Sequence, residues 1–528
     1  MGRYIKTGNA GFREARNREY VDKSGLIGVV NDTLNTEWKF SCVSRARRFG
    51  KSMAAKMLCA FYDCSCDSRE LFADLEIVGH PSFEKHLNKY PVLYLDMSSF
   101  VSKAGEGNIV AQMENALKTD IMAAYPDVAF VQDGDLMDTL LQVVTQRQQQ
   151  FFFIIDEWDA ICREYQTDKS AMDDYVNWLR RMFKDVCATR VFAGVYMTGI
   201  LPIKKYRTQS ALNNFREYSM VTPGALAPYF GFTKEEVQAL AASHGMDFDE
   251  MEKWYDGYQI GPQPSMFNPN SVMEALRNEW CESYWGNTGA FDAITDYIQM
   301  DYEGLKDDII DMLAGGRCAV DPKGFSNDLA DVNTRDDVLT VLIHLGYLSY
   351  DRVNRECFVP NMEVAGELEY AIRANKWKQV VAMLQQSRKL LNATLSGDAD
   401  TVAAMMDAAH SDDTSILSYN NENSLACVVS LAYYYARNEY VIHRELPTGK
   451  GYADLVLIPR KTIAKPAVIV ELKRDKAPAA AISQIRQRDY MQKVKQYTDD
   501  ILLVGISYDR DTKQHSCAIE RWEETENN

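Results

Sequence analysis

The chain has 528 residues, which at roughly 150 residues per domain is enough for about three to four domains. Hydrophobic residues make up 46% and charged residues 25%, a composition that excludes a largely disordered or fibrous protein. The net charge of −17 argues against a surface coated with basic residues for nonspecific binding of nucleic acid. No apolar run approaches the roughly 18 to 20 residues of a membrane span. The N-terminus has no apolar signal core, so we expect a cytoplasmic protein without a membrane partner.

Four segments of the N-terminal third have the composition of buried strands. They are rich in β-branched or aromatic residues and are separated by stretches long enough for helices. They comprise Lys39–Ser44, Pro91–Met97, Phe151–Ile155 and Arg190–Met197. This pattern predicts an α/β fold in which a parallel sheet is joined by helical crossovers.

The first of these segments runs into the pattern of a phosphate-binding loop. The loop reads Arg45-Ala46-Arg47-Arg48-Phe49-Gly50-Lys51-Ser52 and a helical pattern follows it. In such a loop glycine lets the backbone approach the phosphates, lysine reaches the β- and γ-phosphates, and the serine hydroxyl binds Mg²⁺. The first glycine of the full pattern is replaced by Arg45, and a bare Gly-Lys-Ser also occurs by chance. The sequence predicts an ATP site formed by Arg48, Phe49, Gly50, Lys51 and Ser52.

A second acidic motif follows the third strand. Asp156 and Glu157 come directly after an all-apolar run. In phosphate-loop enzymes such an Asp holds Mg²⁺ and a following Glu polarises the attacking water. Acidic residues also cap helices after buried strands. Thr198, at the end of the fourth strand, is at the position of a γ-phosphate sensor, although it can equally satisfy backbone groups there.

These motifs together resemble a known family. The segments that carry the resemblance are Tyr20-Val21-Asp22-Lys23, the loop 45–52, Asp156-Glu157 and Thr198-Gly199-Ile200-Leu201. They look like the AAA-ATPase-like proteins of gut and anaerobic bacteria, which carry a PD-(D/E)xK nuclease-like domain at the C-terminus. The resemblance implies that an Arg at the first-glycine position is usual. Ala46 departs from the family's Pro.

The middle of the chain is less informative. From about residue 231 the pattern is helical, and residues 336–364 fit a helix followed by a small hairpin, as in a winged-helix unit. Such a unit can read DNA or act as a rigid spacer, and the acidic surroundings favour the spacer. We expect an AAA-ATPase-like domain over 1–230, a helical linker region over 231–420 and a nuclease-like domain over 421–528.

The last hundred residues predict a second α/β domain. An amphipathic helix over Asn423–Arg437 precedes three short strands, one further helix and a final strand. These elements comprise Tyr440–Leu446, Tyr452–Ile458, Ala467–Leu472, a helix from Ala479 to Gln496, and Ile501–Ser507. This α-β-β-β-α-β order is the core order of PD-(D/E)xK nucleases. Between Ala432 and Arg510 there are 14 Lys and Arg against 9 Asp and Glu, which suits a phosphate-binding surface or an ordinary fluctuation between domains.

A candidate catalytic set lies on these strands. Glu471 and Lys473 alternate on one strand and therefore point to the same face, and Asp454 joins them if its strand pairs as a hairpin. Two carboxylates make a Mg²⁺ site, and Lys473 can position a metal-bound water. Glu445 could add a further carboxylate. A lone Glu-x-Lys is also a common surface ion pair.

The family pattern adds a Gln and a Tyr in the next helix, matched here by Gln484 and Tyr490. Six residues place them about 120° apart around a helix, so they do not both face the metal, and Gln484 is the better candidate. Four basic residues of the same helix contact phosphate backbone or form a solvated face. They are Arg486, Arg488, Lys493 and Lys495.

The sequence thus predicts an ATP-regulated, Mg²⁺-dependent nuclease acting on nucleic acid, with DNA preferred to RNA. A homo-oligomer is compatible with it, because AAA-type sites often take an arginine from a neighbouring subunit, and Arg207 or Arg216 could serve. One alternative is a nucleotide-gated scaffold that binds nucleic acid or protein through an inactive nuclease fold. Another is an ATPase motor with a vestigial tail.

Overall fold

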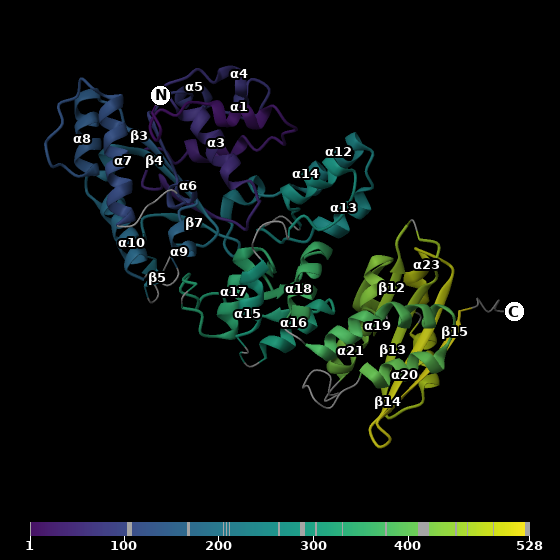
Figure 1. Cartoon of the computed structure of the whole chain (residues 1–528). Helices are drawn as coiled ribbons and strands as arrows, with labels where there is room; N and C mark the ends of the chain where they lie inside the picture. Colours follow the sequence, from purple (N-terminus) through teal and green to yellow (C-terminus); the bar gives the residue numbers. More distant parts are fainter. Residues whose placement is uncertain are drawn as a thin grey trace. The chain divides into compact units, whose positions relative to one another are not determined.

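The computed structural model describes residues 2–102, 108–165, 169–203, 205–206, 209–210, 212–261, 265–285, 291–300, 302, 304–329, 331–374, 377–409, 422–448, 451–461, 463–488 and 490–522. Figure 1 shows the chain coloured along its sequence. It forms two compact units, the first of Met1–Asn287 with Ala319–Val364 and the second of Thr288–Cys318 with Ala365–Asn528. The domain boundaries near 230 and 420 stay predictions. None of the helices within the described ranges is long and apolar enough to span a membrane.

The first unit is built around a five-stranded parallel sheet. Its strands, in spatial order, are β2 (Val92–Asp96), β3 (Phe151–Asp156), β4 (Phe192–Gly199), β1 (Phe40–Ser44) and β7 (Arg216–Tyr218). The predicted α/β class and parallel sheet are confirmed. β7 was not predicted, because it has only three residues and none of them is fully buried. A separate pair of two-residue strands, β5 (Lys205–Tyr206) and β6 (Gln209–Ser210), follows β4.

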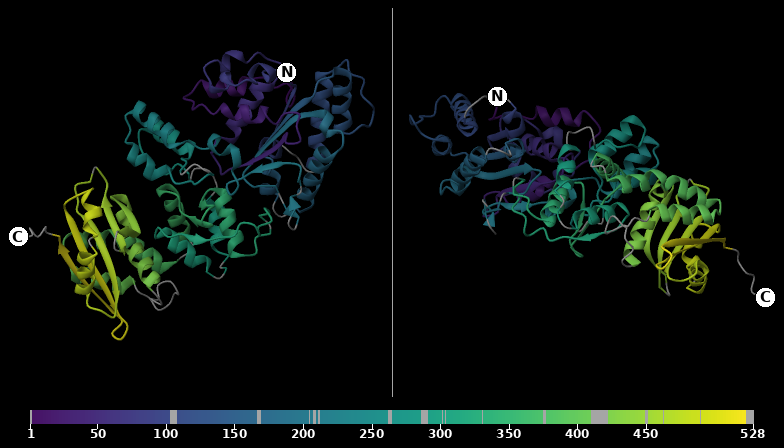
Figure 2. Two further views of the ribbon diagram at one scale, coloured as in Figure 1. Left: turned by 180° about the vertical axis from the view of Figure 1, so that it is seen from behind. Right: turned by 60° about the horizontal axis from the view of Figure 1, so that its bottom comes forward.

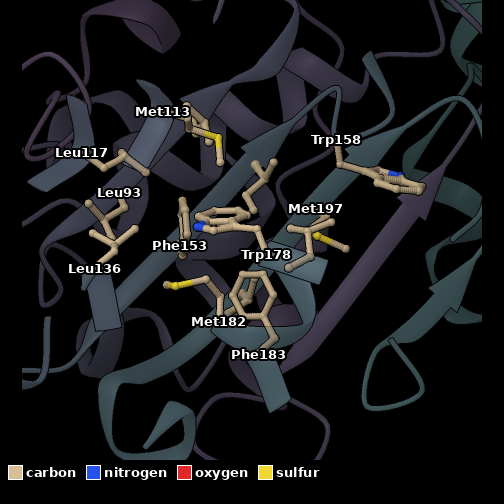
Figure 3. Close-up of a cluster of buried hydrophobic side chains, with 14 of the residues drawn as sticks. Leu93, Met113, Leu117, Leu136, Phe153, Trp158, Trp178, Met182, Phe183 and Met197 are labelled. Atoms are coloured by element: carbon tan, nitrogen blue, oxygen red, sulfur yellow. The ribbon is translucent and has the colours of Figure 1, made fainter. Parts of the chain in front are cut away.

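Helices cover both faces of this sheet (Figure 2). On one face lie α1 (Ala10–Arg16), α2 (Gly25–Asn31), α3 (Lys51–Tyr62), α4 (Arg69–Phe72), η1 (Glu76–Gly79) and α5 (Phe83–His86). On the other lie α6 (Met97–Val101), α7 (Ile109–Ala124), α8 (Leu136–Arg147), α9 (Ala160–Glu164), α10 (Lys169–Lys184) and α11 (Ala188–Val191). Side chains of β3 alternate between the two cores, with Phe153 in the second core and Phe152 in the first. Figure 3 shows Phe153 of the second core among Trp178, Met182 and Phe183. Burial on both faces explains why these strands read as continuous apolar runs.

Helices and a small hairpin complete the first unit. They are η2 (Gly224–Tyr229), α12 (Lys234–His244), α13 (Phe248–Tyr255), α14 (Pro269–Asn278), α17 (Arg335–Leu345), β9 (Ser349–Asp351) and β10 (Glu356–Phe358). Thr233 caps the start of α12 in a capping box with Glu236, and Thr334 starts α17 in the same way. β9 and β10 pair antiparallel, so residues 335–358 form a helix followed by a hairpin. The middle of the chain is mostly helical, as predicted.

The second unit contains a mixed sheet of five strands. Their order is β11 (Tyr440–Thr448), β12 (Gly451–Pro459), β13 (Ala467–Arg474), β14 (Ile501–Asp509) and β15 (Gln514–Arg521). Only β13 and β14 pair in parallel. The helices are α15 (Phe291–Ile298), α16 (Leu305–Leu313), α18 (Met362–Ala374), α19 (Lys378–Leu395), α20 (Ala399–Ala409), α21 (Glu422–Ala432), η4 (Tyr434–Asn438), α22 (Pro478–Gln487) and α23 (Met491–Lys495). The short strand β8 (Cys318–Ala319) lies where the chain passes between the units.

Two features of this unit differ from the prediction. The single helix expected from Ala479 to Gln496 is two helices, α22 and α23, and a fifth strand, β15, follows β14. α22 lies directly against β14, because a Cβ at Gly505 would come within 2.4 Å of the Pro478 carbonyl oxygen. Glycine at this strand position therefore allows the helix and the sheet to approach closely.

Candidate functional sites

The loop between β1 and α3 is shaped as a phosphate-binding loop. Gly50 has a left-handed φ of 86°, from which the chain turns directly into α3. No atom lies within 4 Å of the position that a Cβ would take there, so one side of the loop is open. The Lys51 ammonium is buried and donates hydrogen bonds to the carbonyl oxygens of Arg45 (2.9 Å) and Ala46 (2.8 Å). Burial lowers the pKa of Lys51 to about 8.

Arg45, at the first-glycine position, has a structural role. Its side chain is fully buried, and the guanidinium donates to the carbonyl oxygens of Ser44 (3.0 Å) and Tyr218 (2.8 Å) and lies over the Phe230 ring. Burial lowers its pKa to about 10. The side chain therefore connects the loop to the end of β7 and to Phe230 further along the chain. This explains how the loop is held without the usual first glycine.

Substituting Arg45 or Arg48 by glycine is expected to have different effects on the free energy of unfolding. Arg45→Gly should lower the free energy of unfolding by about 3 kcal/mol, because it opens a cavity and removes the donor to two buried carbonyl groups. Arg48 has a φ of 67°, where glycine is favoured, so Arg48→Gly should leave stability unchanged or raise it by about 0.5–1 kcal/mol. Urea unfolding of the two variants measures both. Equal stabilities would contradict this account of Arg45.

The other predicted loop residues differ in their surroundings. Arg48 is half-buried and makes no hydrogen bond or ion pair with any residue in the described ranges. Phe49 is fully buried and packs edge to face on Tyr258 at 5.0 Å between ring centroids. The Tyr258 hydroxyl donates to the Gly346 carbonyl oxygen at 2.9 Å. Phe49 thus anchors the loop to the helical part of its unit through side-chain packing.

Asp156, Thr198 and Ser52 come together at the carboxyl ends of the strands. β4 lies between β1 and β3, which places Thr198 beside Asp156, and the Thr198 hydroxyl donates to the Asp156 carboxylate. The Tyr94 hydroxyl donates to the other carboxylate oxygen at 3.2 Å. Burial raises the pKa of Asp156, while hydrogen bonds from Thr198 and Ser52 oppose that rise. The predicted residues therefore share one polar site.

A cavity of about 430 Å³ opens beside these residues and is lined by Ser52, Tyr94, Asp96, Asp156 and Glu157 among others. Asp96 was not predicted. It ends β2 in register with Asp156 at the end of β3, and carboxyl ends of neighbouring parallel strands meet at one edge. The same strand-end argument that singled out Asp156 would have found it.

Glu157 is held by an arginine that the sequence did not single out. The Arg163 guanidinium lies 2.6 Å from the Glu157 carboxylate and 3.3 Å from that of Asp159. Asp159 is fully buried and accepts hydrogen bonds from the backbone N–H groups of Ile200 (3.1 Å) and Leu201 (3.0 Å). Asp159 therefore fixes the turn after Thr198, and Arg163 connects that turn to Glu157.

The second candidate site lies on β12 and β13, which pair as an antiparallel hairpin. Asp454 precedes Leu455, and Glu471 follows the paired Val470 on the neighbouring strand. The Asp454 carboxylate accepts a hydrogen bond from the Leu472 backbone N–H at 2.7 Å. The Lys473 ammonium lies 3.0 Å from a Glu471 carboxylate oxygen. The hairpin thus brings the three predicted side chains together.

The Glu471 carboxylate is buried, and its two oxygens have different surroundings. The Glu471 side chain is 2% exposed. One carboxylate oxygen, Oε1, accepts hydrogen bonds from Lys473 and Gln484, whereas the other, Oε2, is buried and has no hydrogen-bond partner among the residues that the structure describes. Burial, followed by the nearby Asp454 carboxylate, raises the pKa of Glu471 to about 7. A divalent cation at Oε2 would give this oxygen a partner and would favour the charged form of the carboxylate.

The residues present fit Mg²⁺ better than zinc. Over the part of the chain that the structure describes, no group of three or more His, Cys, Asp or Glu side chains is arranged around a metal position. Mg²⁺ keeps several waters and is often bound through one or two carboxylates. Asp454 and Glu471 supply that number. The side chain of Glu445, the further carboxylate predicted on β11, lies outside the described residues.

The raised pKa of Glu471 predicts how the stability of the metal-free protein depends on pH. The folded state keeps this proton up to about pH 7, whereas the unfolded chain releases it near pH 4.5. The folded state therefore binds more protons between these values, and stability should fall by roughly 3 kcal/mol as pH rises through this window. Unfolding in EDTA at a series of pH values measures the change. Glu471→Gln should lose this contribution, and an unchanged profile would contradict it.

The helical residues predicted near this site separate into distinct roles. The Gln484 amide donates to Glu471 from α22, but Tyr490 lies after that helix and is buried. Its hydroxyl donates to the Tyr452 carbonyl oxygen at 2.6 Å. Arg488 bonds the Tyr490 hydroxyl at 3.2 Å, and Arg486 pairs with Glu520 at 2.8 Å.

The remaining predicted basic residues are two lysines of α23 and the two arginines that could reach a neighbouring subunit. The Lys495 ammonium lies 4.5 Å from the centre of the Trp522 ring, and Lys493 also lies on α23. Arg216 starts β7 and its guanidinium lies over the Trp38 ring. Arg207 lies outside the described residues.

Comparisons with known proteins match the two candidate sites to two different families. Residues 7–208 match a family described as predicted AAA-ATPase, and residues 420–517 match the PD-(D/E)XK nuclease superfamily. The "Uncharacterized protein in vnfD 5'region" of Azotobacter chroococcum mcd 1 is 22% identical over 534 residues, covering 96% of this chain and 95% of that protein.

Two solved structures are also similar. AMPPCP-bound DnaA from Aquifex aeolicus has 9% identity and a TM-score of 0.25, covering 70% of this chain and 95% of that one. The Aeropyrum pernix ORC1 protein in complex with DNA has 11% identity and a TM-score of 0.25, covering 71% and 98%. From its family matches, the chain carries an AAA-ATPase-like domain at residues 7–208 and a PD-(D/E)XK nuclease superfamily domain at residues 420–517.

Proposed function

We propose that the protein is an ATP-regulated, Mg²⁺-dependent nuclease that hydrolyses phosphodiester bonds of nucleic acid, with DNA the preferred substrate. The observation that carries this proposal is the buried Glu471 carboxylate beside Asp454 and Lys473, one oxygen of which has no hydrogen-bond partner within the described ranges. A site of this kind costs folding free energy in the absence of a cation. An inactive scaffold has no physical need to keep it.

In this proposal Asp454 and Glu471 hold Mg²⁺ at the end of the hairpin. When bound, the metal supplies Lewis acidity that lowers the pKa of a bound water and offsets charge on the phosphoryl group. Lys473 contributes a fixed positive charge 3.0 Å from Glu471 and orients the attacking water or the phosphate oxygens. Gln484 holds the shared oxygen of Glu471 in place. Glu445 is a further candidate for a metal ligand or general base.

The N-terminal unit would bind ATP in the loop of residues 48–52. The backbone N–H groups and Lys51 would contact the phosphates, and Ser52 and Asp156 would hold the accompanying Mg²⁺. Thr198, bonded to Asp156, would sense the γ-phosphate. Glu157 would orient water for hydrolysis once its contact with Arg163 is broken. Nucleotide state would then regulate cleavage by the nuclease-like domain.

A second candidate function is a nucleotide-gated scaffold with an inactive nuclease fold, and the net charge of −17 favours it, because nucleases usually present more basic surface. Incubating labelled DNA and RNA, single- and double-stranded, with the protein in Mg²⁺ or in EDTA separates the two. The nuclease is expected to cut at least one substrate in Mg²⁺ and none in EDTA. Binding without cleavage of any substrate would favour the scaffold.

A further inference from the structure

The helix-and-hairpin unit of residues 335–358 exposes its turn and buries most of its helix. Every residue of α17 from Asp337 to His344 is buried, so this helix has no face to place in a DNA groove. The turn between β9 and β10 is exposed, and Val353 at its tip is 91% exposed. Any surface that this unit offers to a partner therefore includes the turn.

Two arginines of this turn line a polar cavity of about 490 Å³ within the first unit. Arg352 and Arg355 come from the turn, and Lys323 comes from the loop after β8. Another part of the lining is formed by Ser219 and Thr222, which follow β7 and whose hydroxyl groups lie 3.0 Å apart. Three cations from two chain segments thus converge with hydroxyl groups on one space.

These three cations outnumber the two carboxylates that line the same cavity. Within the described ranges, the side chains of Lys323, Arg352 and Arg355 make no hydrogen bond or ion pair. The two carboxylates accept backbone N–H groups, Glu217 from Ile203 at 3.0 Å and Asp321 from Lys323 at 3.2 Å, and they keep their negative charge. In a chain of net charge −17 carboxylates are abundant. A cavity in which three cations stay unpaired favours an anionic ligand.

We infer that this cavity binds a phosphodiester group of nucleic acid. Guanidinium groups match phosphate oxygens with paired N–H donors, Lys323 adds a point charge, and the hydroxyl groups of Ser219 and Thr222 can donate as well. Contacts of this kind hold nucleic acid without reading its sequence. The identity of the ligand as nucleic acid rests on the proposed function, but the site is separate from the carboxylates of β12 and β13.

Binding measured without cleavage tests this inference. Fluorescence anisotropy of a labelled 20-nucleotide DNA strand and a 20-base-pair duplex would be recorded with the full chain in EDTA. Lys323→Ala/Arg352→Ala/Arg355→Ala is expected to bind about 10- to 100-fold more weakly. The slope of log affinity against log salt should fall by about 2 to 3, at roughly 0.7 to 0.9 for each phosphate that the variant no longer neutralises. The single variant Arg352→Ala should show a smaller loss in the same direction.

A matched control is available in the same unit. Arg180, Arg181 and Lys184 line another cavity, but the carboxylates of Glu114, Asp135 and Asp185 line it too, so their triple alanine variant should keep the wild-type affinity and slope. Equal affinity of the wild type and the Lys323 triple variant would overturn the inference. So would a loss of ATP affinity with DNA affinity unchanged, which would assign the cavity to a nucleotide phosphate. Because the readout is binding in EDTA, failure of the proposed nuclease activity would appear separately, as no cleavage in Mg²⁺.

Discussion

Glu471→Gln is expected to abolish Mg²⁺-dependent cleavage of nucleic acid, lowering the rate by about 10³-fold or more. Glutamine has the shape of the protonated carboxyl that the metal-free site favours, because the pKa of Glu471 is raised to about 7. The variant should therefore fold as stably as the wild type while losing the charge that holds the metal. Cleavage of a labelled substrate, together with calorimetric titration of Mg²⁺, measures both effects.

The matched control for this substitution is Glu520→Gln. Glu520 lies on β15 of the same sheet, is exposed, and pairs with Arg486, so its loss should leave cleavage within about twofold, as for an ordinary surface ion pair. Wild-type cleavage by Glu471→Gln would remove Glu471 from the reaction. A calorimetric signal for Mg²⁺ that persists unchanged in Glu471→Gln would place the metal elsewhere.

Lys51→Ala is expected to reduce ATP hydrolysis by about 100-fold or more, because the ammonium is the charge placed inside the phosphate-binding loop. This group donates hydrogen bonds to the carbonyl oxygens of Arg45 and Ala46 within the same loop. ATP affinity, measured with a fluorescent analogue, should fall together with turnover.

Two further variants separate loss of the charge from loss of the fold. Lys51→Met keeps the aliphatic stem in the buried position and should show the same defect as Lys51→Ala. Lys85→Ala, at an exposed position of helix α5, should hydrolyse ATP at the wild-type rate. An ATPase rate in Lys51→Met close to that of the wild type would show that nucleotide chemistry does not use this loop.

Much of the fold could be predicted because its main strands are buried on both faces. β3 is entirely apolar up to Asp156 and is flanked by helix-length segments, which makes a parallel strand the simplest interpretation. β15 was missed because it is an edge strand whose residues are mostly polar and partly exposed, so its pairing with β14 supplies the structure. The break between α22 and α23 was missed because residues 479–496 contain no Pro or Gly to mark it.

In the candidate sites, too, residues placed by local sequence rules could be predicted, and residues placed by tertiary contacts could not. Asp454, Glu471 and Lys473 were predictable because strand alternation and a hairpin are local rules. The role of Asp159 was not, since the turn at Ile200 becomes its neighbour only when β3 and β4 pair. The role of Arg45 was also out of reach, because its side chain bonds a carbonyl group 173 residues later in the chain.

The most direct test of the central proposal is cleavage of labelled DNA in Mg²⁺, with and without ATP, by the wild type, Glu471→Gln and Lys51→Ala. The proposal predicts that ATP changes the rate for the wild type, that this response is lost in Lys51→Ala, and that Glu471→Gln does not cut under either condition. Cleavage that depends on Glu471 but is indifferent to ATP and to Lys51 would contradict the regulation of the nuclease by nucleotide.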